Sequence, residues 1–153
     1  VVTYTKTVKP LLPFVASPEE IVAQMITSTE VKPGQKSIDL GAGDGRVVIA
    51  MAQAGATAVG YEIQKKYARR AKARIAEAGL TDKAQVYEGD FWGITLSPYH
   101  IVTIYGMQAI MERLSNKLKR ELQPGTKIIS NGFPLPDWTI EKQDGHLFLF
   151  RKK

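Results

Sequence analysis

A chain of 153 residues with 44% hydrophobic and 24% charged residues is expected to fold as one globular domain with a real core. It has no cysteine, which excludes disulfides and thiolate nucleophiles, and its two histidines are far apart, so no metal site is expected. The net charge of +6 suggests an acidic partner, either nucleic acid, an anionic membrane surface or an acidic protein.

The first half of the chain predicts an alternation of helices and short strands. Residues 1–16 contain two prolines and are expected to form an irregular N-terminal extension to a single domain over residues 17–153. Ser17 is a good N-cap, Pro18 suits the first position of a helix, and Glu20 completes a capping box. Beyond Pro33-Gly34, strands are predicted at 36–40, 56–63 and 84–88, and helices at about 46–54 and 64–78.

The second half continues this alternation and then departs from it. The loop over residues 89–99 is too short for a full helix, so a turn or a 3₁₀ segment is expected there. Asp144-Gly145 lies between two alternating segments and is a strong hairpin signal. The remaining predictions are strands at 100–105 and 126–131, a helix at about 107–122, and hairpin strands at 139–143 and 146–151. This order indicates an α/β fold with a parallel sheet and a C-terminal hairpin.

Residues 39–45, DLGAGDG, place three glycines at alternate positions directly after a predicted strand. A dinucleotide fingerprint needs its third glycine one position later, where this chain has Arg46, and a P-loop needs Gly-Lys-Ser/Thr, which is absent. Asp39 and Asp44 would also repel a pyrophosphate. S-adenosylmethionine (AdoMet) has an ammonium and a sulfonium but no phosphate, so the acids favour this cationic cofactor, and the glycines let the backbone approach its nucleoside.

Two more acidic residues lie at the ends of the next two predicted strands. Glu62 lies roughly 20 residues after Asp39, the spacing expected of a carboxylate that accepts hydrogen bonds from both ribose hydroxyls. Asp90 is expected to accept from the adenine amino group, and the amide of Phe91 to contact a ring nitrogen. Taken singly, the glycine pattern is also typical of a tight turn, Glu62 of a solvated strand end and Asp90 of a turn cap. Their placement on three successive strand ends favours AdoMet.

Longer segments resemble a known family. The run strand–DxGxGxG–helix is similar to that of class I AdoMet-dependent methyltransferases, which implies a Rossmann-like sheet of seven mostly parallel strands with an antiparallel C-terminal hairpin. LPFVASPEEIV, DLGAGDGRVVIA, TAVGYEI, GDFWGIT, VTIYGM and IISNGFPLPDW resemble a small protein-lysine N-methyltransferase family. That family includes the mitochondrial ATP synthase c-subunit and adenine nucleotide translocase lysine methyltransferases and an archaeal protein-lysine methyltransferase.

Motif and resemblance together assign expected roles. The expected AdoMet-binding residues, which would also hold the product S-adenosyl-L-homocysteine, are Asp39, Gly41, Ala42, Gly43, Glu62, Asp90 and Phe91. Phe14, Phe133 and Trp138 would flank the acceptor lysine, although Phe133 and Trp138 also suit packing under the C-terminal hairpin. Tyr105, at the end of the predicted fourth strand, is the expected catalytic residue, which would orient the amine or help take its proton.

A lysine acceptor must first become neutral. With a pKa near 10.4, deprotonation at pH 7 costs roughly 4–5 kcal/mol, and an apolar slot lowers that cost. Aromatic faces stabilise the methylated ammonium by about 0.5–2 kcal/mol per contact. The residues alone leave three functions open. The first is a protein-lysine methyltransferase, with membrane proteins among its candidate substrates. The second is an RNA or small-molecule methyltransferase, and the third is a non-catalytic AdoMet-fold binding module.

Several features rank these alternatives. The sequence Tyr105-Gly106-Met107 stands where exocyclic-amine nucleic-acid methyltransferases have Asn/Asp-Pro-Pro-aromatic, which counts against nucleic acid. No inserted lid is visible, which favours a protein over a small molecule. The mitochondrial relatives have an N-terminal targeting sequence that this sequence, which begins at Val1, does not show. We expect a monomer, in the cytoplasm or peripheral to a membrane, and an upstream anchor is left open.

Basic residues gather on two predicted helices, at residues 65–74 and 113–120. Solvated helix faces are the simpler interpretation. The functional interpretation is docking to anionic lipid or to an acidic protein near the target. Binding to RNA would instead weaken steeply with salt.

Overall fold

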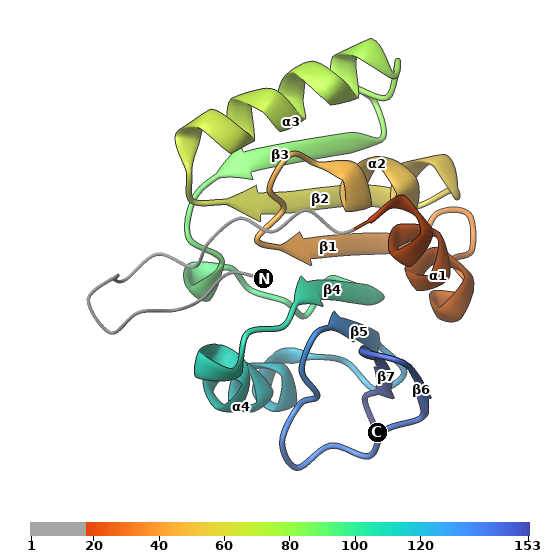
Figure 1. Ribbon diagram of the computed structural model, residues 1–153, viewed down its shortest axis with the longest axis vertical. Helices are drawn as coiled ribbons and strands as arrows, with labels where there is room; N and C mark the ends of the chain where they lie inside the picture. The colour runs from red at the N-terminus through yellow and green to blue at the C-terminus, as the bar shows by residue number, and fades with distance from the viewer. Residues whose placement is uncertain (1–17) are drawn as a thin grey trace.

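Seven strands lie side by side in one sheet in the computed structural model, which describes residues 18–153 (Figure 1). The predictions made for Phe14 and Ser17 lie outside the described residues. The strands are β1 (Lys36–Leu40), β2 (Thr57–Glu62), β3 (Ala84–Glu88), β4 (Ile101–Tyr105), β5 (Lys127–Asn131), β6 (Lys142–Asp144) and β7 (Leu147–Arg151). The helices are α1 (Glu19–Thr29), α2 (Arg46–Gln53), α3 (Lys65–Glu77) and α4 (Met111–Glu121), with 3₁₀ segments η1 (Phe91–Gly93) and η2 (Gln108–Ile110).

The strand order is β3-β2-β1-β4-β5-β7-β6. Strands β1 to β5 are parallel, and β7 runs antiparallel to both β5 and β6. The predicted α/β fold with an antiparallel C-terminal hairpin is therefore confirmed. The predicted helix over 107–122 differs, because its first turn is the separate 3₁₀ segment η2 and the α-helix begins at Met111.

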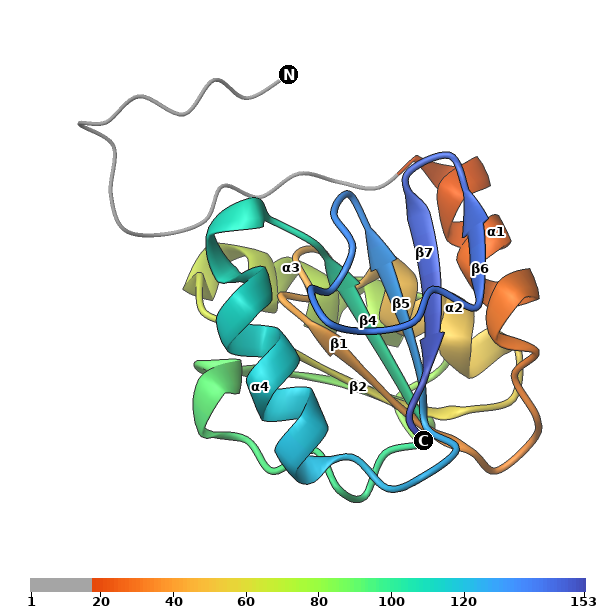
Figure 2. The same cartoon turned by 90° about the horizontal axis from the view of Figure 1, so that it is seen from below.

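Helices cover the two faces of the sheet unequally. Figure 2 shows α4 on one side and α1 and α2 on the other. Side chains alternate between the faces along each strand. Phe148 and Phe150 of β7 pack in the cluster that includes Leu114 of α4, whereas Leu147 and Leu149 pack in the cluster on the opposite face.

Between β3 and β4, the loop with η1 replaces a covering helix, as the length of residues 89–99 predicted. A buried lysine fastens this loop to α4. Lys117 Nζ donates to the carbonyl of Trp92 at 3.1 Å and to Glu121 Oε2 at 2.8 Å, and Glu121 Oε1 accepts from the amide of Leu96 at 2.9 Å. Burial alone would raise the pKa of Glu121, but the hydrogen bonds from Lys117 and Leu96 outweigh it and hold that pKa below its usual value. The loop that carries Asp90 is thus anchored at two points.

Candidate active site

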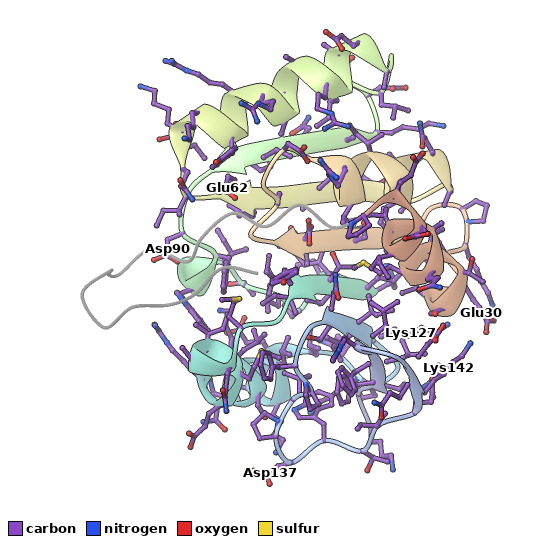
Figure 3. All side chains as sticks on the ribbon, in the orientation of Figure 1. Glu30, Glu62, Asp90, Lys127, Asp137 and Lys142 are labelled. Atoms are coloured by element: carbon purple, nitrogen blue, oxygen red, sulfur yellow. The ribbon has the colours of Figure 1, made fainter. Side chains whose placement is uncertain are left out.

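The carboxyl ends of β1 to β5 meet at one edge of the sheet, because these strands are parallel. Ligands of open α/β sheets bind outside this edge. Figure 3 shows Glu62 and Asp90 at this edge, whereas Lys127 and Lys142 lie at the opposite one. The acidic residues that the sequence singled out are therefore brought together at the expected edge.

The glycine turn follows β1. Gly41, Gly43 and Gly45 have φ angles of +82°, +57° and +85°, a conformation that side chains disfavour. The amides of Gly41 and Ala42 donate to the carbonyl of Tyr61 at 3.0 and 2.9 Å, which ties the turn to the end of β2. Because α2 begins directly after Gly45, the turn presents bare backbone at this edge.

Glu62 joins this turn to β2. Its side chain is buried, with Oε1 accepting from the amide of Gly43 and Oε2 from the amide of Gln64, both at 2.8 Å. An ionised carboxylate oxygen can accept a second hydrogen bond, so both oxygens retain capacity for a ribose diol. The glutamate is held in place before any ligand arrives.

Asp39 is buried beside Glu62, and Thr103 Oγ1 donates to its Oδ1 at 2.8 Å. Burial raises the pKa of Asp39 to about 7; the hydrogen bond from Thr103 opposes this effect and the charge of Glu62 adds to it. A carboxylate that is costly to ionise alone is stabilised by a nearby cation. The two acids therefore fit AdoMet, which offers a diol to one and an ammonium to the other.

Asp44 does not have the role expected from the sequence. Its carboxylate is buried and lies 2.7 Å from both Arg46 of α2 and Arg74 of α3. Burial raises its pKa, but the hydrogen bond and charges of the two arginines outweigh burial and lower it. The expectation that Asp44 attracts the cofactor is wrong, because this carboxylate forms ion pairs with two arginines and links α2 to α3.

Asp90 is exposed, and its Oδ1 accepts from the amide of Trp92 at 3.0 Å. It therefore caps η1, as the alternative interpretation proposed, while its second oxygen is outside this bond. Phe91 is half-buried, with its ring 4.8 Å from that of Trp92. The cap holds the loop in place and leaves one oxygen of Asp90 for another partner. The geometry therefore allows the adenine contacts of Asp90 and Phe91, which stay a prediction.

The described residues expected at the acceptor lie at the end of β4 and in the segment that follows β5. Tyr105 is half-buried and pairs in register with Asn131, and Phe133, just beyond β5, is 42% exposed. Trp138 has the packing role that the sequence left open, since its indole donates to Ser115 Oγ at 3.0 Å and its ring meets Phe150 edge-on at 6.2 Å. Tyr105 and Phe133 thus occupy neighbouring strand ends, and their contacts with a substrate stay predictions.

Two site residues were missed in the sequence, Thr103 and Gly60. Thr103 supplies the hydroxyl that holds Asp39, and its signal was a polar residue inside the apolar run of β4. A Cβ on Gly60 would lie 2.5 Å from Ala42 Cβ and 2.8 Å from Val48 Cγ2, so only glycine lets the turn pack on β2. A glycine within a strand pattern is a signal of such close approach.

Within residues 18–153, no cluster of three or more histidines, aspartates and glutamates is arranged to hold a metal ion. Over the same residues, every helix is too short or too polar to span a bilayer.

The fold has a close counterpart among solved structures. The RNA methyltransferase from Salinibacter ruber, in complex with S-adenosyl-L-homocysteine, superposes with a TM-score of 0.83 and 29% identity, over 90% of this chain and 92% of that one. A sheet of this order, with carboxylates at the ends of β1 and β2, defines a class I AdoMet-dependent methyltransferase.

More narrowly, the chain belongs to the ANTKMT methyltransferase domain family, whose sequence profile matches residues 39–142. It is 36% identical to the human lysine N-methyltransferase of the ATP synthase c-subunit over 137 residues, which is 90% of this chain and 58% of the human protein. It is 34% identical to a protein-lysine N-methyltransferase of Saccharolobus islandicus (strain REY15A) over 144 residues, which is 90% of this chain and 89% of that protein. The family, enzyme class and cofactor expected from the sequence are confirmed.

Proposed function

We propose that this chain transfers methyl groups from AdoMet to the ε-amine of a lysine in a protein substrate. The observation that carries the proposal is similarity over 90% of the chain to two proteins named as lysine N-methyltransferases. This similarity continues past the cofactor-binding strands, and the matched family domain extends to residue 142, through the acceptor side.

On the cofactor side, the chain's own residues bind and orient. Glu62 accepts hydrogen bonds from the ribose, and Asp39 faces the ammonium of the methionine moiety. Asp90 and the amide of Phe91 hold the adenine. AdoMet supplies a methyl group on a sulfonium, which is already an excellent leaving group, so the protein mainly aligns donor and acceptor.

On the acceptor side, Tyr105 is the residue that we assign to act on the amine. It ends β4, which lies between β1 and β5 in the sheet, so this strand end is flanked by the glycine turn after β1 and by the end of β5. Its hydroxyl orients the lysine nitrogen or helps to take its proton, and the exposed ring of Phe133 stabilises the methylated product. A membrane-protein substrate, contact with an anionic membrane surface, a monomeric state and a location in the cytoplasm or at a membrane surface belong to the same proposal.

A second candidate is methylation of RNA, which the name of the Salinibacter relative favours. Incubation with labelled AdoMet and a cell lysate, followed by protease or nuclease, separates the two. Label that resists nuclease and is lost to protease supports the protein substrate, and the opposite result supports RNA. Label in neither fraction, with AdoMet still bound, would leave a small-molecule substrate or a binding module, and an Asp39→Ala variant gives the background.

A further inference from the structure

The positive charge of this protein is concentrated in α3. Six basic side chains and one acidic side chain give this helix a net charge of +5, whereas the whole chain has +6. The other elements together are therefore close to neutral. The basic residues are Lys65, Lys66, Arg69, Arg70, Lys72 and Arg74.

These charges have little structural use. Arg74 pairs with Asp44, but the other five side chains are exposed and form no ion pair with an acidic residue anywhere in residues 18–153. Lys66 and Arg70 lie 4.9 and 5.5 Å from the ring centroid of Tyr67. Like charges four residues apart destabilise a helix, so this arrangement opposes folding of α3. We call the five exposed residues the α3 basic face.

The α3 basic face adjoins the active site. The helix starts just after Glu62, so its first turn stands at the edge where β1, β2 and β3 end (Figure 1). Tyr105 lies across the ends of β2 and β1, on β4. A partner that touches both α3 and the acceptor must therefore span the cofactor side, which a macromolecule does and a small molecule does not.

We infer that the α3 basic face docks an acidic surface of the protein substrate, an inference that rests on the proposed function. Single-stranded RNA is bound on exposed aromatic platforms, and the one aromatic residue of α3, Tyr67, is half-buried and in contact with two cations. Helices that lie on membranes insert large apolar side chains, and the outward positions between the charges hold only Ala73 and Ala76. Carboxylates on a protein surface fit Lys and Arg without either feature.

Two charge-reversed variants with the same net charge test the inference. One is Arg69→Glu with Lys72→Glu on α3, and the matched control is Lys119→Glu with Arg120→Glu on α4, all at exposed positions. The probe is fluorescent poly-L-glutamate, with binding followed by anisotropy. We expect the α3 variant to lose at least about tenfold in affinity and the α4 control to stay within about twofold. Calorimetry should give all three proteins the same affinity for AdoMet.

Competing probes complete the test. Equal losses in both variants would show a net-charge effect and overturn the inference. The inference would also be overturned if the protein bound polyuridylate, or vesicles of phosphatidylcholine with phosphatidylserine, more tightly than poly-L-glutamate and lost that binding in the α3 variant. In the labelled lysate, the α3 variant should label proteins several-fold less than the α4 control. Undiminished protein label refutes only the docking inference, whereas label that only nuclease removes refutes the proposed function itself.

Discussion

The two ends of the candidate site are built differently. On the cofactor side, Asp39 and Glu62 are buried and their oxygens already accept hydrogen bonds from the protein. On the acceptor side, Tyr105 is half-buried and Phe133 is 42% exposed. A cofactor shared by a whole class of enzymes is met by a preorganised, buried site. The side chains proposed to contact a protein substrate stand at the surface.

The largest expected effect comes from a substitution on the acceptor side alone. Tyr105→Phe removes the hydroxyl that we propose acts on the amine, so we expect kcat to fall by about a hundredfold while the affinity for AdoMet is unchanged. Single-turnover methyl transfer and calorimetry measure the two quantities. Tyr87→Phe, at an exposed tyrosine of β3, is the matched control. An unchanged kcat would remove Tyr105 from the catalytic role.

The next largest effect is expected from a substitution on the cofactor side. Glu62→Ala removes the proposed ribose ligand and the acceptor for the amides of Gly43 and Gln64, so AdoMet should bind at least about tenfold more weakly. The neighbouring Glu88, which pairs with Glu62 in register at the end of β3 but is exposed, provides the control Glu88→Ala. Equal affinities of the two variants in calorimetry would exclude Glu62 from the site.

The pH dependence of AdoMet binding sharpens the comparison at Asp39. Since its pKa is about 7 without a cation, a bound ammonium selects the ionised carboxylate, and affinity should rise about tenfold from pH 6 to pH 8. Asp39→Asn should flatten this rise. A wild-type profile that the variant reproduces would show that another group titrates.

The same pKa predicts how stability changes with pH in the cofactor-free protein. The folded carboxyl holds its proton up to about pH 7, whereas the unfolded one, with a pKa of 3.8, releases it much lower. The free energy of unfolding should therefore gain from this group at low pH, decline from about pH 4 to 7, and change no further above that. Chemical denaturation of the wild type and of Asp39→Asn at matched pH values should differ in this window.

The smallest expected effect concerns the loop that carries Asp90. Lys117→Met keeps the apolar stem but removes the bonds to Trp92 and Glu121, so the KM for AdoMet should rise about threefold with kcat unchanged. The free energy of unfolding should fall by about 1–2 kcal/mol. The exposed Lys119→Met is the control. A loss of stability without a change in KM would give Lys117 a purely structural role.

The parts of the molecule that the sequence predicted are those set by local pattern. Strands β1 and β3 begin and end where predicted, because strand periodicity is local. The C-terminal hairpin also forms as predicted, but Asp144 pairs with Leu147, so its turn is Gly145-His146 and its first strand is residues 142–144, not 139–143. The gathering of Asp39, Glu62 and Asp90 at one edge of the sheet was likewise predicted, since strand ends and a glycine turn define that edge. The ion pair between Asp44 and Arg74 was not, because the partners are 30 residues apart and meet only once α3 packs on the sheet. The packing role of Trp138 also depends on a distant partner, Ser115.

The proton that Asp39 keeps in the cofactor-free protein has a consequence for any thermodynamic study of this enzyme. Near neutral pH, binding of the cofactor's ammonium beside Asp39, as proposed above, should displace that proton into the solvent. The heat of complex formation will then include the ionisation enthalpy of whichever buffer accepts it, so titrations in phosphate and in Tris should disagree by an amount that counts the protons released.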